Sequence, residues 1–154
     1  MGKVSLVLTL VLFLQVIPAS ARLGETKEQL IVRYGEPIKP IKPVADRGRI
    51  IAHVMYFRFN GFLVDATLFD GVCHGEDFHF TSEPQRIAVL PAILEANAGG
   101  KQWVVDKPGS WGREDRQVSG MLSADGLHFF MWTFRMLDWV YRGMTPAQEV
   151  QKGL

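Results

Sequence analysis

Apolar and polar residues alternate between Arg49 and Phe80 with the period of two that is typical of β-strands. Three runs rich in β-branched and aromatic residues are separated there by Asn60-Gly61 and Asp70-Gly71. Both dipeptides accept the positive φ angles of two-residue hairpin turns, so we expect an antiparallel meander. In the middle run, one face carries Phe62, Val64, Ala66 and Leu68, and the other carries Leu63, Asp65, Thr67 and Phe69. This pattern predicts a sheet with one face on the core and one mixed face.

A second β region follows residue 101 of the chain. Its runs extend from Gln102 to Asp106, from about Arg113 to Ser123, and from Leu127 to Leu137. A turn at 107–109 separates the first two runs, and Ala124-Asp125-Gly126 separates the last two. The second Asp-Gly turn again predicts a hairpin, so this region should contribute two or three strands.

A short helix is predicted before the first β region. Thr26 and Gln29 have the spacing of a capping box, in which each side chain satisfies a free backbone amide of the other residue. Gly35 can adopt the left-handed conformation that ends a helix, and Pro37 prevents its continuation. The helix should therefore cover about two turns.

A second helix is predicted between the two β regions, from Ser82 to Asn97, where Ser82 and Gln85 repeat the capping spacing and apolar residues recur at helical intervals. Pro91 leaves two alternatives: the helix kinks at this residue, or it begins there with proline in its first turn. Gly99-Gly100 ends it in both cases. A last short helix is expected after Thr145-Pro146, where proline would take the first helical position.

This order of elements predicts an α+β fold. Strands and helices do not alternate singly, as parallel sheets require, so the sheet should be antiparallel with about five to six strands in hairpins. We expect a single domain over residues 22–154 whose two short helices cover one face of the sheet. The proline-rich segment 36–48 should be an extended connector inside that domain.

Residues 1–21 have the pattern of a cleavable signal peptide. Lys3 precedes an apolar run that ends at Ile17, and Ala19 and Ala21 occupy the two positions that the signal peptidase reads. The alternative is a transmembrane anchor, but a run of about fourteen residues is shorter than the roughly twenty that span a bilayer. We therefore expect a periplasmic or secreted protein that begins at about Arg22 and has no stable membrane insertion.

Charge and cysteine content narrow the classes of partner. Loss of Lys3 with the leader reduces the 17 basic residues to sixteen, which equals the 16 acidic residues. A neutral chain has no general attraction for nucleic acid or for an anionic membrane. Cys73 is the only cysteine, so it should be a half-buried free thiol or, alternatively, form an intermolecular disulfide.

The segments Gly24-Glu25-Thr26-Lys27-Glu28-Gln29 and Tyr34-Gly35-Glu36-Pro37 carry a family resemblance. They resemble the opening of the SmpA/OmlA outer-membrane assembly lipoproteins and of β-lactamase-inhibitor-like domains. The chain is also similar to a set of uncharacterised bacterial secreted proteins. The resemblance implies a small exported α+β domain with helices over one antiparallel sheet, and it transfers no functional residue.

Cys73, His74 and His79 are the obvious candidates for a metal site. An uninterrupted strand would place Cys73, Asp77 and His79 on one face, but Cys73 and Asp77 would then be about 13 Å apart, too far for one ion. We therefore interpret these residues as the polar side of the sheet. His128, in an apolar run, should be a packed side chain.

No pattern in the chain nominates a catalytic residue or a cofactor. The G-x-S-x-G elbow, phosphate loops, CxxC and HExxH are missing from the sequence. Trp111 and Arg113 lie in a glycine-rich stretch, where an exposed aromatic-arginine tip could bind a partner; the alternative is that Trp111 folds back over the sheet.

These observations predict an exported, non-enzymatic module that binds a protein or another ligand of the cell envelope. The alternative is a metal-binding or hydrolytic protein that uses Cys73, His74 and His79. The sequence leaves the oligomeric state open.

Overall fold

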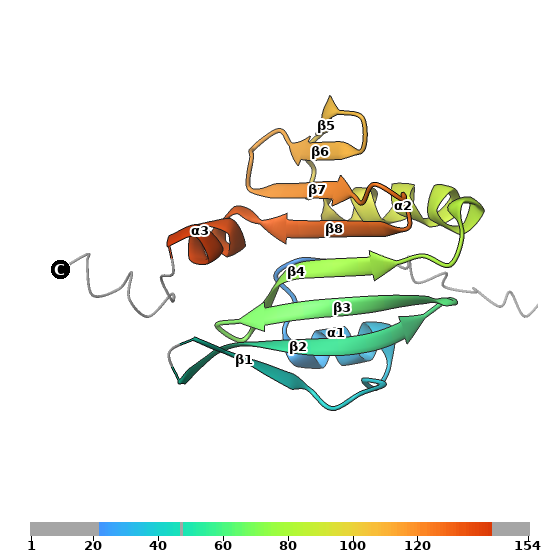
Figure 1. The fold of residues 1–154 in the computed structure, drawn as a ribbon. Helices are drawn as coiled ribbons and strands as arrows, with labels where there is room; N and C mark the ends of the chain where they lie inside the picture. Colours follow the sequence, from blue (N-terminus) through green and yellow to red (C-terminus); the bar gives the residue numbers. More distant parts are fainter. Residues whose placement is uncertain (1–21, 47, 143–154) are drawn as a thin grey trace, which may run out of the picture.

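Eight strands form one antiparallel sheet in the computed structural model, which describes residues 22–46 and 48–142 (Figure 1). The strand order across the sheet is β1-β2-β3-β4-β8-β7-β6-β5. The elements in chain order are α1 (Lys27–Tyr34), β1 (Lys42–Asp46), β2 (Arg49–Phe59), β3 (Phe62–Phe69), β4 (Val72–His79), α2 (Glu83–Ala98), β5 (Trp103–Lys107), β6 (Ser110–Arg113), β7 (Val118–Leu122), β8 (His128–Thr133) and α3 (Phe134–Arg142).

The chain runs through the same order of elements twice. A helix followed by four sequential strands, α1 with β1 to β4, is succeeded by α2 with β5 to β8. In each half an Asp-Gly turn, Asp70-Gly71 or Asp125-Gly126, precedes the last strand. The two last strands, β4 and β8, pair at the centre of the sheet and form a seam between the halves.

Both predicted helix starts are confirmed. Thr26 and Gln29 form the capping box of α1, and the Ser82 hydroxyl accepts a hydrogen bond from the Gln85 amide at the start of α2. α2 continues on both sides of Pro91, so the helix does not begin there. Pro91 lies on the exposed side of α2, where water can hydrate the carbonyl group that lacks a helical donor.

The core lies between the sheet and the two helices α1 and α2, which Figure 1 shows behind the sheet. Leu30 of α1 and Ile93 of α2 are almost fully buried. They belong to the same cluster as the large side chains Phe57, Phe78 and Phe129 of the sheet. The antiparallel α+β fold with two helices over this face is therefore confirmed.

The prediction of five to six strands was too low, because two strands were missed. β1 lies within the proline-rich segment 36–48 and pairs with β2 at the edge of the sheet. An edge strand tolerates Pro43, since one side of its backbone needs no partner. β6 contains only four residues, and its Gly112 and Ser110 resemble loop residues in sequence.

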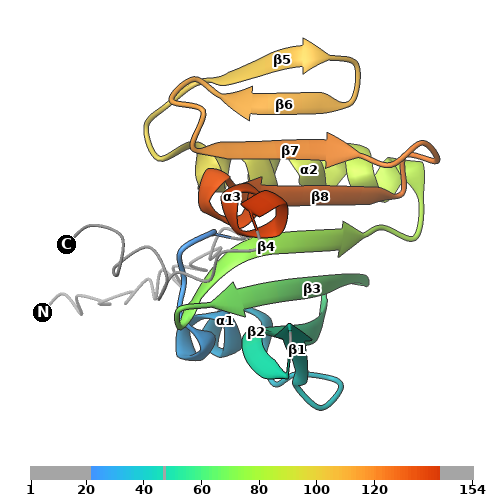
Figure 2. The same ribbon diagram turned by 60° about the vertical axis from the view of Figure 1, so that its left-hand side comes forward.

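α3 packs against the opposite face of the sheet, so the expectation that helices cover one face alone was wrong (Figure 2). Trp139 of α3 stacks on Phe69 with ring centroids 5.4 Å apart. Thr133 accepts a hydrogen bond from the Met136 amide and ends β8 earlier than the predicted Leu137. The helix expected after Thr145 lies outside the described residues.

A carboxyl group is fully buried in the core beneath α1. The Glu76 side chain has no exposed surface, and its Oε1 accepts a hydrogen bond of 3.0 Å from the Tyr34 hydroxyl. Its Oε2 is also buried and has no hydrogen-bond partner among residues 22–46 and 48–142. Burial disfavours the charged form and raises the pKa of Glu76 from 4.5 to about 8, although the Tyr34 hydrogen bond opposes the change.

We predict that Glu76→Gln makes stability less dependent on pH. Because the pKa of Glu76 is higher in the folded chain, the folded state binds the extra proton between about pH 5 and pH 8. The free energy of unfolding of the wild-type chain should therefore fall as pH rises through this window, by up to about 1.4 kcal/mol per pH unit. Urea unfolding at several pH values measures the slope.

Glu36→Gln is the matched control, because Glu36 is exposed. It should leave the slope unchanged. Equal slopes for wild type and Glu76→Gln would contradict the assignment of the buried proton to Glu76.

Candidate functional site

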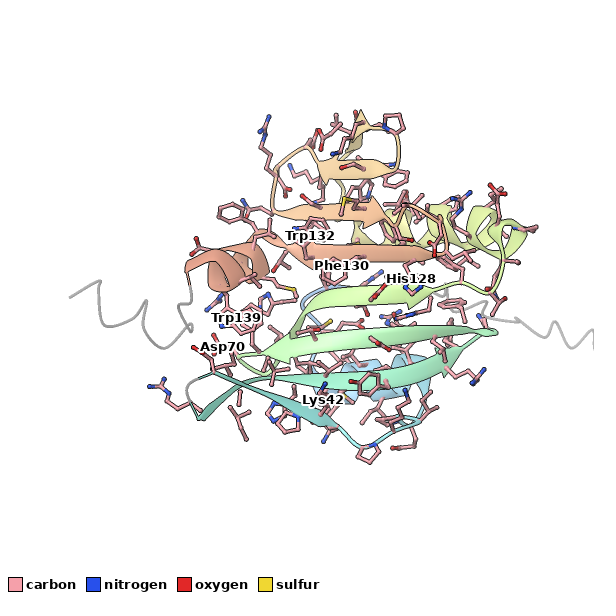
Figure 3. All side chains as sticks on the ribbon, viewed as in Figure 1. Lys42, Asp70, His128, Phe130, Trp132 and Trp139 are labelled. Carbon is pink, nitrogen blue, oxygen red and sulfur yellow. The ribbon has the colours of Figure 1, made fainter. Side chains whose placement is uncertain are left out.

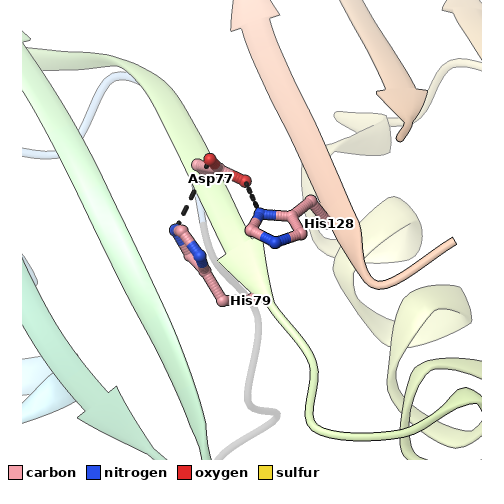
Figure 4. A group of neighbouring side chains, drawn as sticks. All are labelled: Asp77, His79 and His128. Atoms are coloured by element: carbon pink, nitrogen blue, oxygen red, sulfur yellow. Dashed lines mark ion pairs between the residues drawn. The ribbon is translucent and has the colours of Figure 1, made fainter. Parts of the chain in front are cut away.

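An aspartate and two histidines meet on the open face of the sheet, at the seam between β4 and β8 (Figure 4). Asp77 and His79 are two residues apart on β4, so their side chains point to the same face. His128 begins β8 and is the direct cross-strand partner of His79. Figure 3 shows His128 in line with Phe130 and Trp132 on the face turned away from α1 and α2.

The ligand atoms of these three side chains are close enough to share one ion. One atom from each residue lies within 4.8 Å of the corresponding atoms of the other two. His79 Nε2 is 3.4 Å from Asp77 Oδ2, and His128 Nδ1 is 3.8 Å from Asp77 Oδ1. Bonds of about 2.1 Å in a tetrahedral zinc site separate neighbouring ligand atoms by about 3.4 Å. The cluster needs only small side-chain shifts to fit that geometry.

Asp65 of β3 supplies a fourth group beside the cluster. Its Oδ2 is 3.4 Å from His79 Nε2. The Asp77 oxygen Oδ2 is at the same distance from this nitrogen. Asp65 and Asp77 are cross-strand partners in the β3–β4 ladder, which places them on the same face. Asp65 therefore lies next to the three-residue cluster and contacts it through His79.

The electrostatics of Asp77 are those of a partly desolvated carboxylate that has cationic neighbours. Burial raises the pKa of Asp77, and the positive charge that His79 and His128 can carry counteracts this rise. Asp77 Oδ1 and His79 Nε2 are both inaccessible to water and have no hydrogen-bond partner within the described chain. Their charged neighbours lie at 3.4 Å and 3.8 Å, beyond the usual hydrogen-bond distance, and an ion bound between the side chains would replace these long contacts with ligand bonds.

The structure does not bring Cys73, His74 and His79 together. The β3–β4 pairing shifts between Thr67 and Leu68, and His74 is the extra residue of this bulge. Beyond the bulge the faces are reversed, so Cys73 belongs to the core while Asp77 and His79 face outward. The expectation that Cys73, Asp77 and His79 share a face was therefore wrong.

Cys73 and His74 each have a structural environment of their own. The Cys73 thiol is free and fully buried, deeper than the half-buried position expected, and burial raises its pKa well above the usual value. His74 stacks on Phe69 at 3.8 Å, and its Nδ1 lies 2.9 Å from the Thr133 hydroxyl. Burial, followed by the nearby charge of Arg135, lowers the pKa of His74 to about 4, so the ring is neutral.

Trp111 lies in β6, so the interpretation of its segment as a loop was wrong. Its ring is half-buried and meets Phe129 edge to face, with centroids 5.6 Å apart. Gly120, the cross-strand partner of Trp111, leaves the space that the Phe129 ring occupies. Arg113 pairs with Asp115 at 2.8 Å and donates to the Asn97 carbonyl at the end of α2. A partner-binding role for Trp111 and Arg113 stays a prediction.

His128 is the member of the site that sequence reasoning missed. It was interpreted as a packed side chain because it stands in an apolar run, whereas it is half-buried beside Asp77. No local sequence signal could have found it, because only the pairing of β8 with β4 places His128 beside Asp77 and His79.

Comparison of the chain with protein-family models, with curated proteins and with solved structures gives no match in any of the three. The resemblance to SmpA/OmlA-type domains therefore has no independent support and stays a prediction. Among the described residues, none of the helices has both the length and the apolar character needed to span a bilayer. The predicted signal peptide, including Ala19 and Ala21, lies outside the described residues.

We predict that Trp111→Ala destabilises the protein by about 2 kcal/mol, because it removes a half-buried ring that packs against the core aromatic Phe129. Urea unfolding measures the loss. Val105→Ala is the control, since Val105 is exposed on the paired strand β5 and should change stability by less than about 0.5 kcal/mol. An unchanged unfolding free energy for Trp111→Ala would restore the view of Trp111 as a free recognition residue.

Proposed function

We propose that this protein is an exported, non-enzymatic binding module whose ligand is a divalent transition-metal ion. The observation that carries the proposal is the convergence of Asp77, His79 and His128, with ligand atoms within 4.8 Å of one another. The leader pattern of residues 1–21 supports export.

The donor set favours zinc among the common divalent ions. Imidazole nitrogen binds zinc, copper, nickel and iron, whereas magnesium and calcium prefer sites made of oxygen alone. Two imidazoles with one or two carboxylates also suit the tetrahedral coordination that zinc adopts. The separation of 3.4 Å between His79 Nε2 and the Asp65 and Asp77 oxygens is close to that of neighbouring ligand atoms around zinc.

Asp65 favours binding over catalysis. Catalytic zinc sites keep a coordination position open for water or substrate, whereas structural sites are closed by four protein ligands. We assign Asp65 to the fourth position, because its Oδ2 lies as close to His79 Nε2 as the Asp77 oxygen does. The ion would then have no position for substrate.

We predict that the purified mature protein binds one zinc ion per chain in isothermal titration calorimetry. Zinc at one hundred times its dissociation constant should stabilise the fold by about 2.7 kcal/mol, because only the folded chain assembles the site. His79→Ala and His128→Ala should each lose most of this stabilisation. Asp65→Asn should weaken binding about tenfold or more if Asp65 completes the coordination.

His53→Ala is the matched control, because His53 is exposed and lies away from the cluster on β2. It should bind zinc like the wild type. Affinity should also fall as the pH is lowered, because metal ligands must be deprotonated and binding therefore competes with protons. Wild-type protein that takes up no zinc at neutral pH, or a His79→Ala variant that binds it equally well, would overturn the proposal.

A further inference from the structure

A cavity of about 730 Å³ opens at the corner of the fold where α1, the β1–β2 hairpin and the β3–β4 turn meet. It is separate from the metal cluster, since none of the residues that line it is Asp65, Asp77, His79 or His128. Its volume falls in the range of sites that bind small organic ligands, about 300 to 1,000 Å³.

The cavity has an apolar interior. Ala52, Met55 and Leu68 line it and are almost completely shielded from water, with exposed fractions of 1%, 1% and 5%. Ile50 stands at its rim with 62% of its surface exposed. An exposed isoleucine next to an apolar hollow is the arrangement expected where a hydrocarbon ligand binds.

The charged residues at the cavity favour an anion. Lys27 at the start of α1 and Arg49 at the start of β2 line it, and both are exposed. Within residues 22–46 and 48–142, neither of them has an ion-pair partner. Asp70, the acidic residue of the lining, is paired at 2.9 Å with Arg135 of α3. The cavity therefore presents two cations without an acidic partner among the described residues, and one carboxylate that Arg135 neutralises.

We propose that this cavity binds a single-chain amphiphile with an anionic head, such as a free fatty acid. The hydrocarbon chain lies against Ile41, Ile50 and Ile51, which line the cavity and keep exposed surface. The head group lies between Lys27 and Arg49. The proposal stands independently of metal binding, because the two sites share no residue.

The test is calorimetric titration with dodecanoate below its micellar concentration, at pH 8. We expect one molecule to bind per chain. Dodecyl phosphate should bind as well, because it has the same tail and the same sign of charge, whereas dodecyltrimethylammonium should bind roughly tenfold more weakly or not at all. Equal binding of the cationic and anionic amphiphiles would overturn the proposal.

Exposed side chains supply variants that leave the core intact. Lys27→Ala with Arg49→Ala should weaken dodecanoate binding roughly fivefold to tenfold. The control is Lys101→Ala with Lys107→Ala, which removes the same amount of charge from exposed positions. Lys101 precedes β5 and Lys107 ends it, so this variant should bind dodecanoate like the wild type. His79→Ala should bind dodecanoate normally, which separates this test from that of the metal site.

Vesicles of phosphatidylglycerol form the last arm of the experiment. The proposed cavity holds one chain as a monomer, so the protein should not sediment with these vesicles. Sedimentation with vesicles, together with no heat from monomeric dodecanoate, would show a membrane-surface interaction and would overturn the proposal.

Discussion

The antiparallel pairing of β4 with β8 joins the two halves of the chain into one sheet. It contains five residue pairs, from Gly75 with Trp132 to His79 with His128. On the inner face, Phe78 and Phe129 are paired and stack at 6.2 Å, so the two halves share one core. On the outer face, the adjacent pair brings His79 and His128 together. One register therefore determines both the centre of the core and the centre of the candidate site.

The bulge at His74 sets which residues of β4 face which way. A strand alternates its side chains, so one inserted residue exchanges the faces for all residues on one side of it. Because of this exchange Cys73 and Glu76 both point into the core, while Asp77 and His79 point outward. Without the bulge, Cys73 would lie on the same face as Asp77 and His79, as an uninterrupted alternation predicts. The outward cluster of Asp77 and His79 and the inward Glu76–Tyr34 hydrogen bond thus depend on the same local irregularity.

The parts of the fold that sequence could predict are those with local causes. The Asn60-Gly61 and Asp70-Gly71 turns and the caps at Thr26 and Ser82 act over a few residues, and all four lie where the sequence indicated. The pairing of β4 with β8 joins segments about fifty residues apart, and no local pattern specifies it. For this reason Asp77 and His79 could be recognised as neighbours on one strand, but His128 could not be added to them. The edge strand β1 was missed because its proline-rich sequence resembles a connector, and β6 was missed because its four residues include Ser110 and Gly112, which resemble loop residues.

The position of the proposed ion also explains what it would add to the fold. A chain with one buried thiol has no disulfide to hold its halves together, and each half contributes only one strand to the seam. Ligands from β4 and β8, with Asp65 from β3, would connect three adjacent strands across that seam. The ligands stand on strands rather than on loops, so the sheet holds them near their final geometry before the ion arrives. An ion bound there would stabilise the contact between the halves more than either half alone, because its ligands come from both.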